Sequence, residues 1–538
     1  MSGWLRRRTF ESNGLSRREL GRLASFLLLG GWVPSRSASV AGASAASGVS
    51  QAAADVYRAL GVRPLINCRG TVTIIGGSIE LPVVREAKSL ANQHHVHLDE
   101  LMEAAGKRLA ELTRTEWGIV TAGCAAAISH ATAACVAGGN PDLHVRIPNL
   151  AGFARNEVII PSHSRTVYDA AVRAVGVDVI EVDSLEALEL AIGPKTAMIY
   201  LRPNAENEFG PMPTDAIARI AAPNGIPILV DAAAEILTVP NVHLERGATL
   251  VCYSGGKVIR GPQSAGLLLG RKDLVRAAWV HSAPHHGFAR SMKVGREEVI
   301  GMLAAVESWV TRDHEAEWKE WVGRCDYIAD HVTRIPGVTA SVQREPGHRN
   351  NRSARVSLSW DSESLGITGA EVADMLFNTE PRIALGGRAR AASGGDTGIS
   401  INAAMMSSGD EKTVADRVYQ VLSMKHTPRP AATPAPPVGD VTGHWKVDIR
   451  FAAGRSTHTL DLVQRGNTVE GTHQGDFLAR ELTGTIDGER VDFATSPAAF
   501  HGDRLEFSFS GRLNGESMSG SLDMGEYLGA SWSAVRRT

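Results

Sequence analysis

Residues 253–266 read Tyr-Ser-Gly-Gly-Lys-Val-Ile-Arg-Gly-Pro-Gln-Ser-Ala-Gly, and this stretch decides the fold. It sets one lysine, Lys257, in a glycine-rich turn that leads into the apolar segment 267–269. Earlier in the chain, Asp231 ends the apolar segment 226–230, which is typical of a short buried strand. A loop lysine and a strand-end aspartate suit pyridoxal phosphate (PLP), because the amine bonds to its aldehyde and the carboxylate keeps its ring nitrogen protonated. The pair therefore predicts a PLP site with Lys257 and Asp231 as catalytic residues.

Each of these two residues also has a simpler interpretation by itself. Lys257 fits a solvated loop lysine, and Asp231 fits the N-cap of the alanine-rich segment that follows it. The wider pattern favours the PLP hypothesis, because apolar strands alternate with helical segments and predict a largely parallel sheet covered on both faces. Ligands of such sheets bind at the carboxyl ends of the strands. Four candidate residues fall at predicted strand ends: Thr121, His163, Asp231 and Ser254.

The string from Ser254 to Gly270 resembles the fold-type-I PLP enzymes related to bacterial selenocysteine synthase. Within that family it is most similar to the branch named for D-glucosaminate-6-phosphate ammonia-lyase, and the resemblance extends over residues 56–424. It implies an α/β fold with a PLP-binding large domain (55–300) and a small α/β domain (301–425). It also implies PLP as cofactor, a small amino acid or amino sugar acid as substrate, and a homodimer or larger homo-oligomer.

Other segments match positions that contact the cofactor in this family. Residues 117–127 read as a strand, a glycine turn and the start of a helix, whose free N–H groups and positive dipole end suit a phosphate. The resemblance makes this turn the phosphate loop, contributing mainly backbone from three residues: Gly123, Cys124 and Ala125. It also assigns a phosphate-binding hydroxyl to Ser254 and stacking on the ring to His163. Alternatively, His163 is a strand-end histidine bonded to backbone.

Three basic residues are candidates for binding anionic groups. Arg69 lies in a segment that resembles the family's N-terminal active-site segment, although a surface or salt-bridged arginine is an equal alternative. Arg290 and Lys293 precede a predicted helix start that resembles a family motif, and they could reach a phosphate of the cofactor or the substrate, in the same subunit or its partner. A plain helix start explains the same residues.

Composition limits the alternatives. The chain has 538 residues, enough for two or three domains, and a net charge of −2, which argues against nucleic acid as a partner. Its five cysteines lack CxxC spacing. His94, His95 and His97 lie close together but without an aspartate or cysteine at ligand spacing, so no metal site is expected.

The first 43 residues resemble a twin-arginine export signal. Arg17 and Arg18 precede the apolar segment 23–33 and a stretch of small residues that ends near residue 43. The apolar segment is too short to span a bilayer stably. The pattern predicts a periplasmic or secreted protein. The alternative is a cytoplasmic protein whose N-terminus forms an amphipathic helix.

The last part of the chain has a different period. A proline-rich linker at 426–440 precedes residues 441–538, where apolar and polar residues alternate and turn signals recur. This pattern predicts an antiparallel β meander that closes into a small barrel or sandwich, with no residue that looks catalytic. Before the linker, one long helix carrying Trp309, Trp318 and Trp321 is expected.

The predicted reaction begins when the amine of an amino-acid-like substrate replaces Lys257 on the cofactor, and the freed Lys257 amine then removes the α-proton. The resemblance favours β-elimination with release of ammonia from an amino sugar acid or a hydroxy amino acid. A PLP-dependent racemase or another PLP lyase is an alternative within catalysis. An exported ligand-binding protein that keeps the fold without the cofactor is an alternative from another class.

Overall fold

The computed structural model describes residues 56–204, 208–388, 395–426, 434–495, 506–525 and 527–537. The predicted export signal and the linker segment 427–433 lie outside these residues. Within them, no helix is both long enough and apolar enough to cross a bilayer. Residues up to Pro64 belong to a separate unit, so the following description concerns residues 65–538.

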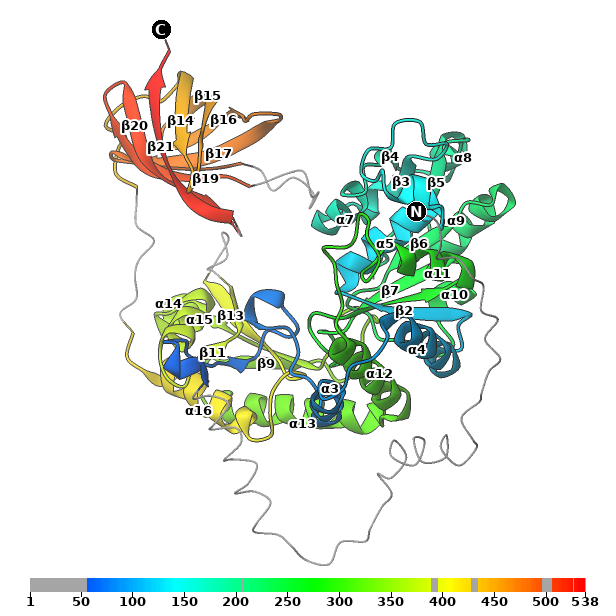
Figure 1. Cartoon of the computed structure of the whole chain (residues 1–538). Helices are drawn as coiled ribbons and strands as arrows, with labels where there is room; N and C mark the ends of the chain where they lie inside the picture. Colours follow the sequence, from blue (N-terminus) through cyan, green and yellow to red (C-terminus); the bar gives the residue numbers. More distant parts are fainter. Residues whose placement is uncertain are drawn as a thin grey trace, which may run out of the picture. The chain divides into compact units, whose positions relative to one another are not determined.

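A seven-stranded sheet forms the centre of the large domain (Figure 1). Its strand order is β2-β8-β7-β6-β5-β3-β4, and every neighbouring pair is parallel except those that involve β8. The carboxyl ends of the six parallel strands therefore lie at the same edge as the beginning of β8. This arrangement confirms the predicted, largely parallel sheet. The strands are β2 (Trp117–Thr121), β3 (Glu157–Pro161), β4 (Asp178–Val182), β5 (Thr196–Leu201), β6 (Ile228–Asp231), β7 (Leu250–Ser254) and β8 (Gly266–Gly270).

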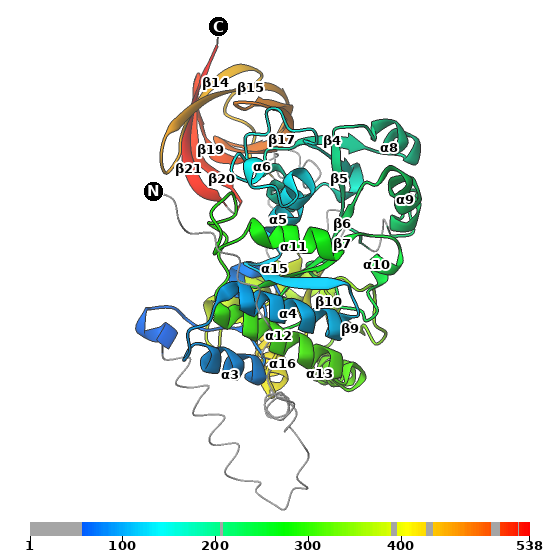
Figure 2. The ribbon, with the colours of Figure 1, turned by 45° about the vertical axis from the view of Figure 1, so that its right-hand side comes forward.

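Helices cover both faces of this sheet, which explains its continuous apolar strands. Figure 2 shows α11 (Lys272–Val280) on one side of β2, with α4 (Leu98–Thr113) and α12 (Arg296–Thr311) on the other. On the face of α11, the alanine-rich α5 (Cys124–Ala137) packs across the sheet, and all its residues except Ala125 are buried. Small side chains let this helix lie close to the strands. The remaining helices of the domain are α3 (Pro82–Ala91), α6 (Pro141–His144), α7 (Ala170–Arg173), α8 (Leu185–Ala191), α9 (Thr214–Ala221) and α10 (Val242–Glu245).

The small domain has its own sheet and its own hydrophobic cluster. Its strand order is β12-β13-β10-β9, and the N-terminal strand β1 (Ile66–Asn67) pairs in parallel with β11 (Ile383–Ala384). Cys68 is buried in this second cluster, so the segment after β1 packs with the small domain. The elements are β9 (Thr339–Val342), β10 (Arg355–Asp361), β12 (Gly386–Arg388), β13 (Asp396–Asn402), α13 (His314–Val332), α14 (Ser362–Leu365), α15 (Gly369–Asn378) and α16 (Asp410–Ser423).

The single long helix expected around the three tryptophans is wrong. The chain forms two helices, because α12 ends at Thr311 and α13 begins at His314. Asp313 caps the second helix, since its side chain accepts a hydrogen bond from the backbone N–H of Ala316. An N-cap aspartate starts a new helix and so interrupts the preceding one.

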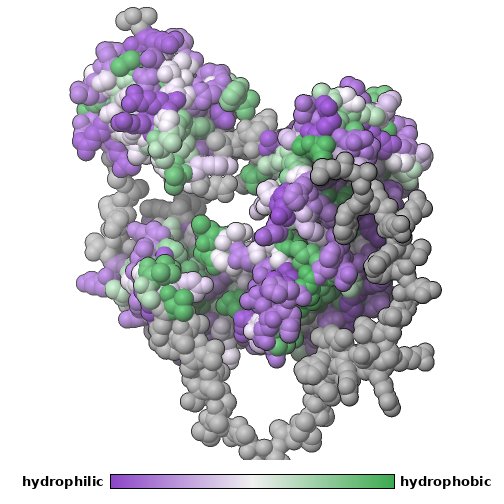
Figure 3. All heavy atoms as spheres, viewed as in Figure 1, coloured by the Kyte–Doolittle hydropathy of each residue, from purple (hydrophilic) through white to green (hydrophobic). Residues whose placement is uncertain are grey.

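The C-terminal residues form a closed eight-stranded antiparallel barrel, which decides between the predicted barrel and sandwich. Inward side chains alternate with outward ones, and the inward set builds a third hydrophobic cluster around Trp445, Phe493 and Phe509. The outer surface that is visible in Figure 3 is mostly hydrophilic, as this alternation requires. The strands are β14 (Gly443–Arg450), β15 (Arg455–Arg465), β16 (Thr468–Gln474), β17 (Ala479–Asp487), β18 (Arg490–Thr495), β19 (Ser508–Asn514), β20 (Ser517–Met524) and β21 (Tyr527–Arg536).

Candidate active site

Asp231 ends β6 at the centre of the sheet edge, and only 4% of its surface is exposed. Its Oδ2 accepts a hydrogen bond from the hydroxyl of Tyr200 on β5, with an O–O distance of 2.8 Å. Its Oδ1 accepts a hydrogen bond from the backbone N–H of Ala233 at 3.0 Å. A buried carboxylate is costly unless it is hydrogen-bonded. These donors therefore compensate for its removal from water.

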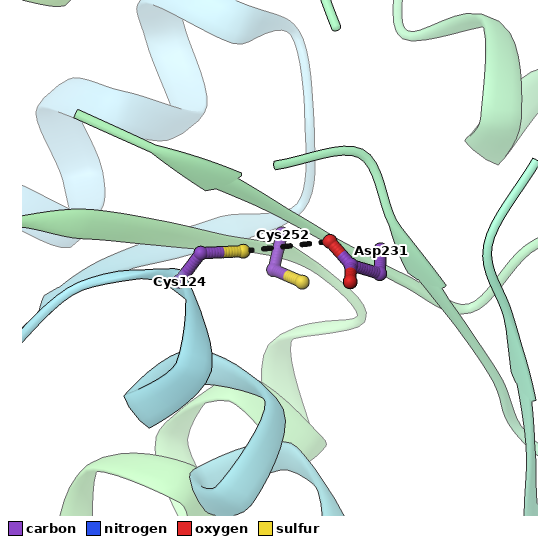
Figure 4. A group of neighbouring side chains, drawn as sticks. All are labelled: Cys124, Asp231 and Cys252. Carbon is purple, nitrogen blue, oxygen red and sulfur yellow. Dashed lines mark hydrogen bonds between the residues drawn. The ribbon is translucent and has the colours of Figure 1, made fainter. Parts of the chain in front are cut away.

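Two thiols lie beside the same carboxylate (Figure 4). Cys124 begins α5, and its Sγ donates to Asp231 Oδ1 at 3.7 Å, while Cys252 lies opposite Asp231 on the neighbouring strand β7. The three groups are within 4.8 Å of one another, and among the described residues they are the one cluster spaced to hold a metal ion. Contact with Cys252 and burial raise the pKa of the Cys124 thiol well above its usual value, and burial raises that of Cys252. Metal binding would require deprotonated thiols, which this environment opposes.

Lys257 lies in the turn between β7 and β8, with its side chain half-buried. Its Nζ donates a hydrogen bond to the backbone carbonyl of Thr71 at 2.8 Å. Burial lowers the pKa of this amine, Cys124 and Asp231 raise it, and Arg202 lowers it. The net lowering increases the fraction of neutral amine, which is the form that attacks an aldehyde or accepts a proton. The charge of Asp231 therefore acts on the amine of Lys257.

The turn that carries Lys257 is closed by its own backbone. A Cβ at Gly255 would come within 2.5 Å of the carbonyl oxygen of Pro262, so only glycine fits there. Arg260 adopts the left-handed region with a φ of 59°, and its carbonyl accepts a hydrogen bond from the N–H of Leu81 at 3.2 Å. A non-glycine residue in this region stores strain and persists only where its surroundings fix it. The turn therefore holds Lys257 on a rigid support.

The predicted phosphate loop lies next to this turn. Gly123 precedes α5 with a φ of 89°, and α5 has no side-chain cap, so its first N–H groups have no side-chain acceptor. A Cβ at Gly123 would meet no atom within 4 Å, which shows open space at this position. On the other side, a Cβ at Gly266 would lie 2.6 Å from the backbone nitrogen of Cys124. The start of β8 thus supports the loop from behind and leaves its front open to an anion.

Comparison with known proteins agrees with this geometry. The family model described as class V aminotransferase matches residues 86–285. The chain is 29% identical over 335 residues to the D-glucosaminate-6-phosphate ammonia lyase of Salmonella typhimurium, covering 61% of this chain and 88% of that protein. It is 32% identical over 342 residues to a 5'-C-glycyluridine monooxygenase-decarboxylase of a Streptomyces species, covering 61% of this chain and 83% of the relative. The chain belongs to the class V aminotransferase family.

A solved structure supports the same assignment for this class V aminotransferase family member. The structure of D-glucosaminate-6-phosphate ammonia-lyase superposes with a TM-score of 0.61 at 26% identity, covering 69% of this chain and 98% of that one. The resemblance seen in the sequence is therefore confirmed, together with the fold type I architecture and its PLP cofactor. The C-terminal barrel forms a separate sheet, in addition to the sheets of the PLP-binding part.

The residues of this class V aminotransferase family member fit PLP at three points. The uncapped start of α5 faces open space and can bind the phosphate group. Asp231 accepts three hydrogen bonds, which leaves one of its four lone-pair positions for the N–H of the ring. Lys257 supplies an amine with a lowered pKa for the covalent bond. Together, these groups match the three chemical features of the cofactor.

The other predicted cofactor residues lie around this site. Ser254 ends β7 opposite Gly266, while Ala125 is an exposed residue in the first turn of α5. His163 lies in a 3₁₀ turn after β3, and partial burial lowers the pKa of its ring. No hydrogen bond to this ring is present within the described residues, so the alternative of a backbone-bonded histidine gains no support there. The stacking role of His163 stays a prediction.

A cavity of about 820 Å³ opens beside Lys257. Arg69, Arg352 and Arg355 line it together with Asn351 and other polar groups. Within the described residues, none of these three guanidinium groups has a carboxylate partner. Unpaired arginines in a cavity favour an anionic ligand, because guanidinium groups bind carboxylate and phosphate in a bidentate manner. The structure thus brings the predicted Arg69 to Lys257 and adds two arginines from the small domain.

A buried charge network fixes the wall that carries the new arginines. Arg349 pairs with Glu208 at 2.9 Å and with Glu235 at 3.1 Å, and both carboxylates are nearly inaccessible to water. The adjacent backbone N–H of Asn351 donates to the carbonyl of Ala234 at 2.8 Å. Because Ala234 follows Asp231 by three residues, this network ties the cavity wall to the loop that follows Asp231.

Arg290 and Lys293 are exposed and do not line the cavity of their own subunit. Their loop follows α11 and precedes α12. The prediction that they reach a phosphate in the same subunit therefore finds no support in this cavity. The version in which they act on a partner subunit remains a prediction.

Sequence reasoning missed several residues of the site. Tyr200 reads as one more apolar strand position, and only its neighbour Asp231 in space reveals its role. Arg352 and Arg355 lie almost a hundred residues after the lysine turn and carry no local motif.

Proposed function

We propose that this protein is a PLP-dependent lyase that eliminates ammonia from an acidic amino sugar or a hydroxy amino acid. The net reaction converts a 2-amino-3-hydroxy acid to a 2-oxo acid and ammonia: the α-proton and the β-hydroxyl leave as water, and one water re-enters. Bound PLP supplies the electron sink that makes the α-proton acidic. The single observation that carries the proposal is the position of Lys257 in a cavity whose arginines have no carboxylate partner among the described residues, next to the strand that ends at Asp231.

The chain supplies a base at the correct place. Partial burial lowers the pKa of the Lys257 amine, so a larger fraction of it is neutral and able to accept the α-proton. The carbonyl of Thr71 accepts a hydrogen bond from the same amine and so directs it in the resting protein. Lys257 is therefore both the attachment point and the base of the proposed reaction.

The cavity favours an acidic substrate. Arg352 and Arg355 lie on the small-domain side, and Arg69 lies on the N-terminal segment, so they approach a ligand from different segments. Arg69 is presented by a compact turn, because Asn67 Oδ1 accepts hydrogen bonds from the N–H groups of Arg69 and Gly70 at 2.9 and 3.1 Å. Three cations suit a ligand with more than one negative charge, such as a sugar acid that also carries a phosphate. The relative from Salmonella is named for a substrate of that kind.

A substrate screen tests the proposal. Purified protein with PLP would be offered amino sugar acids, their phosphate esters and hydroxy amino acids, and ammonia and 2-oxo acid would be measured. Equal amounts of both products with a Lys257-dependent rate support elimination. Stereochemical inversion without ammonia would identify a racemase instead, and release of carbon dioxide would identify a decarboxylase.

We also propose that the protein is exported and works as a homodimer. The paired arginines and apolar segment before residue 43 support export through the twin-arginine route, which carries folded, cofactor-loaded proteins. The exposed Arg290 and Lys293 support a dimer, because they lack acidic partners among the described residues. Cell fractionation with an Arg17→Lys/Arg18→Lys variant tests the first proposal. Light scattering of the purified protein tests the second.

A further inference from the structure

The carboxylate of Asp231 is surrounded by more donors than a simple strand-end aspartate needs. Oδ1 accepts from the Cys124 thiol and from the N–H of Ala233, and Oδ2 accepts from the Tyr200 hydroxyl. A carboxylate has about four lone-pair positions. One position, on Oδ2, remains for the ring N–H of PLP. The other three hydrogen bonds fix the orientation of the carboxylate and so the direction of this remaining lone pair.

The two side-chain donors come from different parts of the fold. Tyr200 lies on β5 and is fully buried, with 0% of its surface exposed, while Cys124 begins α5 and is also buried. Burial and the charge of Asp231 raise the pKa of the Tyr200 hydroxyl well above its usual value, so it stays a donor at all working pH values. Cys124 also contributes to two different parts of the site. Its backbone N–H belongs to the predicted phosphate loop, whereas its side chain reaches the carboxylate at the other end of the site.

We propose that Tyr200 and Cys124 are positioning residues for Asp231, which fix the plane of its carboxylate so that the remaining lone pair of Oδ2 points at the ring N–H of PLP. This inference rests on the cofactor and not on the proposed substrate. Cys124 then contributes its side chain as well as the backbone that the sequence predicts. It also couples the phosphate-binding end of the site to the end that holds the ring nitrogen.

Removal of either donor has a defined consequence. A carboxylate that loses one of these donors is free to rotate away from the ring nitrogen, so the hydrogen bond that holds the ring proton weakens. The ring then carries less positive charge, and the nitrogen that joins Lys257 to the cofactor holds its own proton to higher pH. The charged and titratable groups that face this region are Tyr200 from β5, Cys124 from α5, Cys252 from β7, Lys257 from the turn after β7, and Arg202 through its effect on Lys257.

The experiment uses the purified full-length protein with PLP, in Tyr200→Phe and Cys124→Ala forms. Each has a matched control. Tyr253→Phe removes a buried tyrosine hydroxyl that accepts a hydrogen bond from Asn241, and Cys135→Ala removes a buried thiol near the other end of α5. Two quantities are measured without any substrate. They are the pH midpoint of the visible absorbance band of the bound cofactor and the dissociation constant of PLP.

We expect the midpoint to move to higher pH in Tyr200→Phe and, by less, in Cys124→Ala, with PLP bound about tenfold more weakly in the former. Cys124→Ser should restore the midpoint, because its hydroxyl also donates. The controls should keep both quantities within a factor of about two. Unchanged midpoints in both test variants would overturn the inference. A loss of thermal stability of the PLP-free protein with an unshifted midpoint would likewise overturn it, since that would show a purely structural role.

Discussion

Lys257 donates a hydrogen bond from Nζ to the backbone carbonyl of Thr71, 2.8 Å away and 186 positions earlier in the chain. The same N-terminal segment carries Arg69 into the cavity and pairs with the small domain through β1. The reactive amine is therefore held by a segment that also contacts substrate-binding groups. Formation of the covalent bond to PLP must break this hydrogen bond, which makes the segment sensitive to the state of the lysine.

Replacing Lys257 with alanine should abolish covalent attachment of PLP. Borohydride reduction followed by peptide mass analysis should find the cofactor on residue 257 in the parent protein and nowhere in Lys257→Ala. Lys195→Ala is the control, because Lys195 is a surface residue with a side chain that is 66% exposed. Labelling of another lysine in the parent protein would contradict the assigned attachment point.

The rate at which the PLP-free protein captures PLP should depend on pH with a midpoint below the ordinary lysine value of 10.5, because burial lowers the pKa of Lys257. The neutral amine is the reactive form, so a lowered pKa moves the rising limb of the profile to lower pH. Asp231 raises the pKa of Lys257, so Asp231→Asn should move the midpoint further down. A midpoint of 10.5 or above would be incompatible with the described burial. Stopped-flow absorbance measures both profiles.

Gly266→Ala should weaken PLP binding through the phosphate loop. The new Cβ would lie 2.5 Å from the carbonyl carbon of Gly123 and 2.6 Å from the nitrogen of Cys124, so the loop must shift. Steric insertion of this kind costs roughly 1–3 kcal/mol, or about 5- to 150-fold in affinity if the loop absorbs it. Gly139→Ala is the control, because a Cβ there meets no atom within 4 Å. Equal PLP affinities for the two variants would refute the described support of the loop.

Loss of the cavity arginines should raise KM more than it lowers kcat. Arg355→Gln and Arg352→Gln each remove a cation that has no carboxylate partner in the described structure, so neither leaves an unpaired acid behind. A charged hydrogen bond contributes about 1.5–3 kcal/mol, which corresponds to roughly 10- to 150-fold in KM. Arg219→Gln, which breaks an exposed pair with Asp215, is the control. Steady-state kinetics on the substrate found by the screen would show an unchanged KM if these arginines had no part in binding.

Glu208→Gln should destabilise the protein at neutral pH and should lose this effect in acid. Burial opposes the charge of Glu208, but Arg349, Arg246 and His348 together lower its pKa from 4.5 to about 2. A lowered folded-state pKa stabilises the fold above about pH 4.5, and this contribution declines as the pH falls toward 2. Urea unfolding at several pH values measures the difference between parent and variant. A difference that did not shrink between pH 5 and pH 2 would contradict the role of this carboxylate, and the exposed Glu315→Gln is the control.

The central sheet, the strand-end position of Asp231 and the turn position of Lys257 could be predicted because they depend on local signals. The apolar segment before Asp231 and the glycine turn around Lys257 each specify a strand end or a tight turn without reference to the rest of the chain. The helix at Leu98–Thr113 begins and ends where its apolar spacing indicates. In the sequence, Gly266 is only one residue of the lysine motif. The structure shows that its missing side chain makes room for the predicted phosphate loop.

The remainder of the site depends on contacts between distant segments. Nothing in the sequence around Tyr200 distinguishes it from a core residue, and its hydroxyl gains a role only through the pairing of β5 with β6. Arg352 reaches the cavity because Arg349 anchors its segment to two acids from the large domain. The helix break at the Asp313 N-cap is likewise invisible to periodicity, because the apolar spacing continues across it. Such features arise from packing and cannot be deduced from periodicity.

The ring of strands from β14 to β21 leaves no strand with unpaired neighbours, since β14 bonds to both β15 and β21. Another polypeptide therefore cannot add itself as a ninth strand, which is a common route to both peptide capture and aggregation. Any macromolecule that binds the barrel must therefore contact its outward side chains or the turns at either rim. Because every strand of the barrel is already paired, the barrel does not offer an edge strand that could pair with the sheets of the enzyme part.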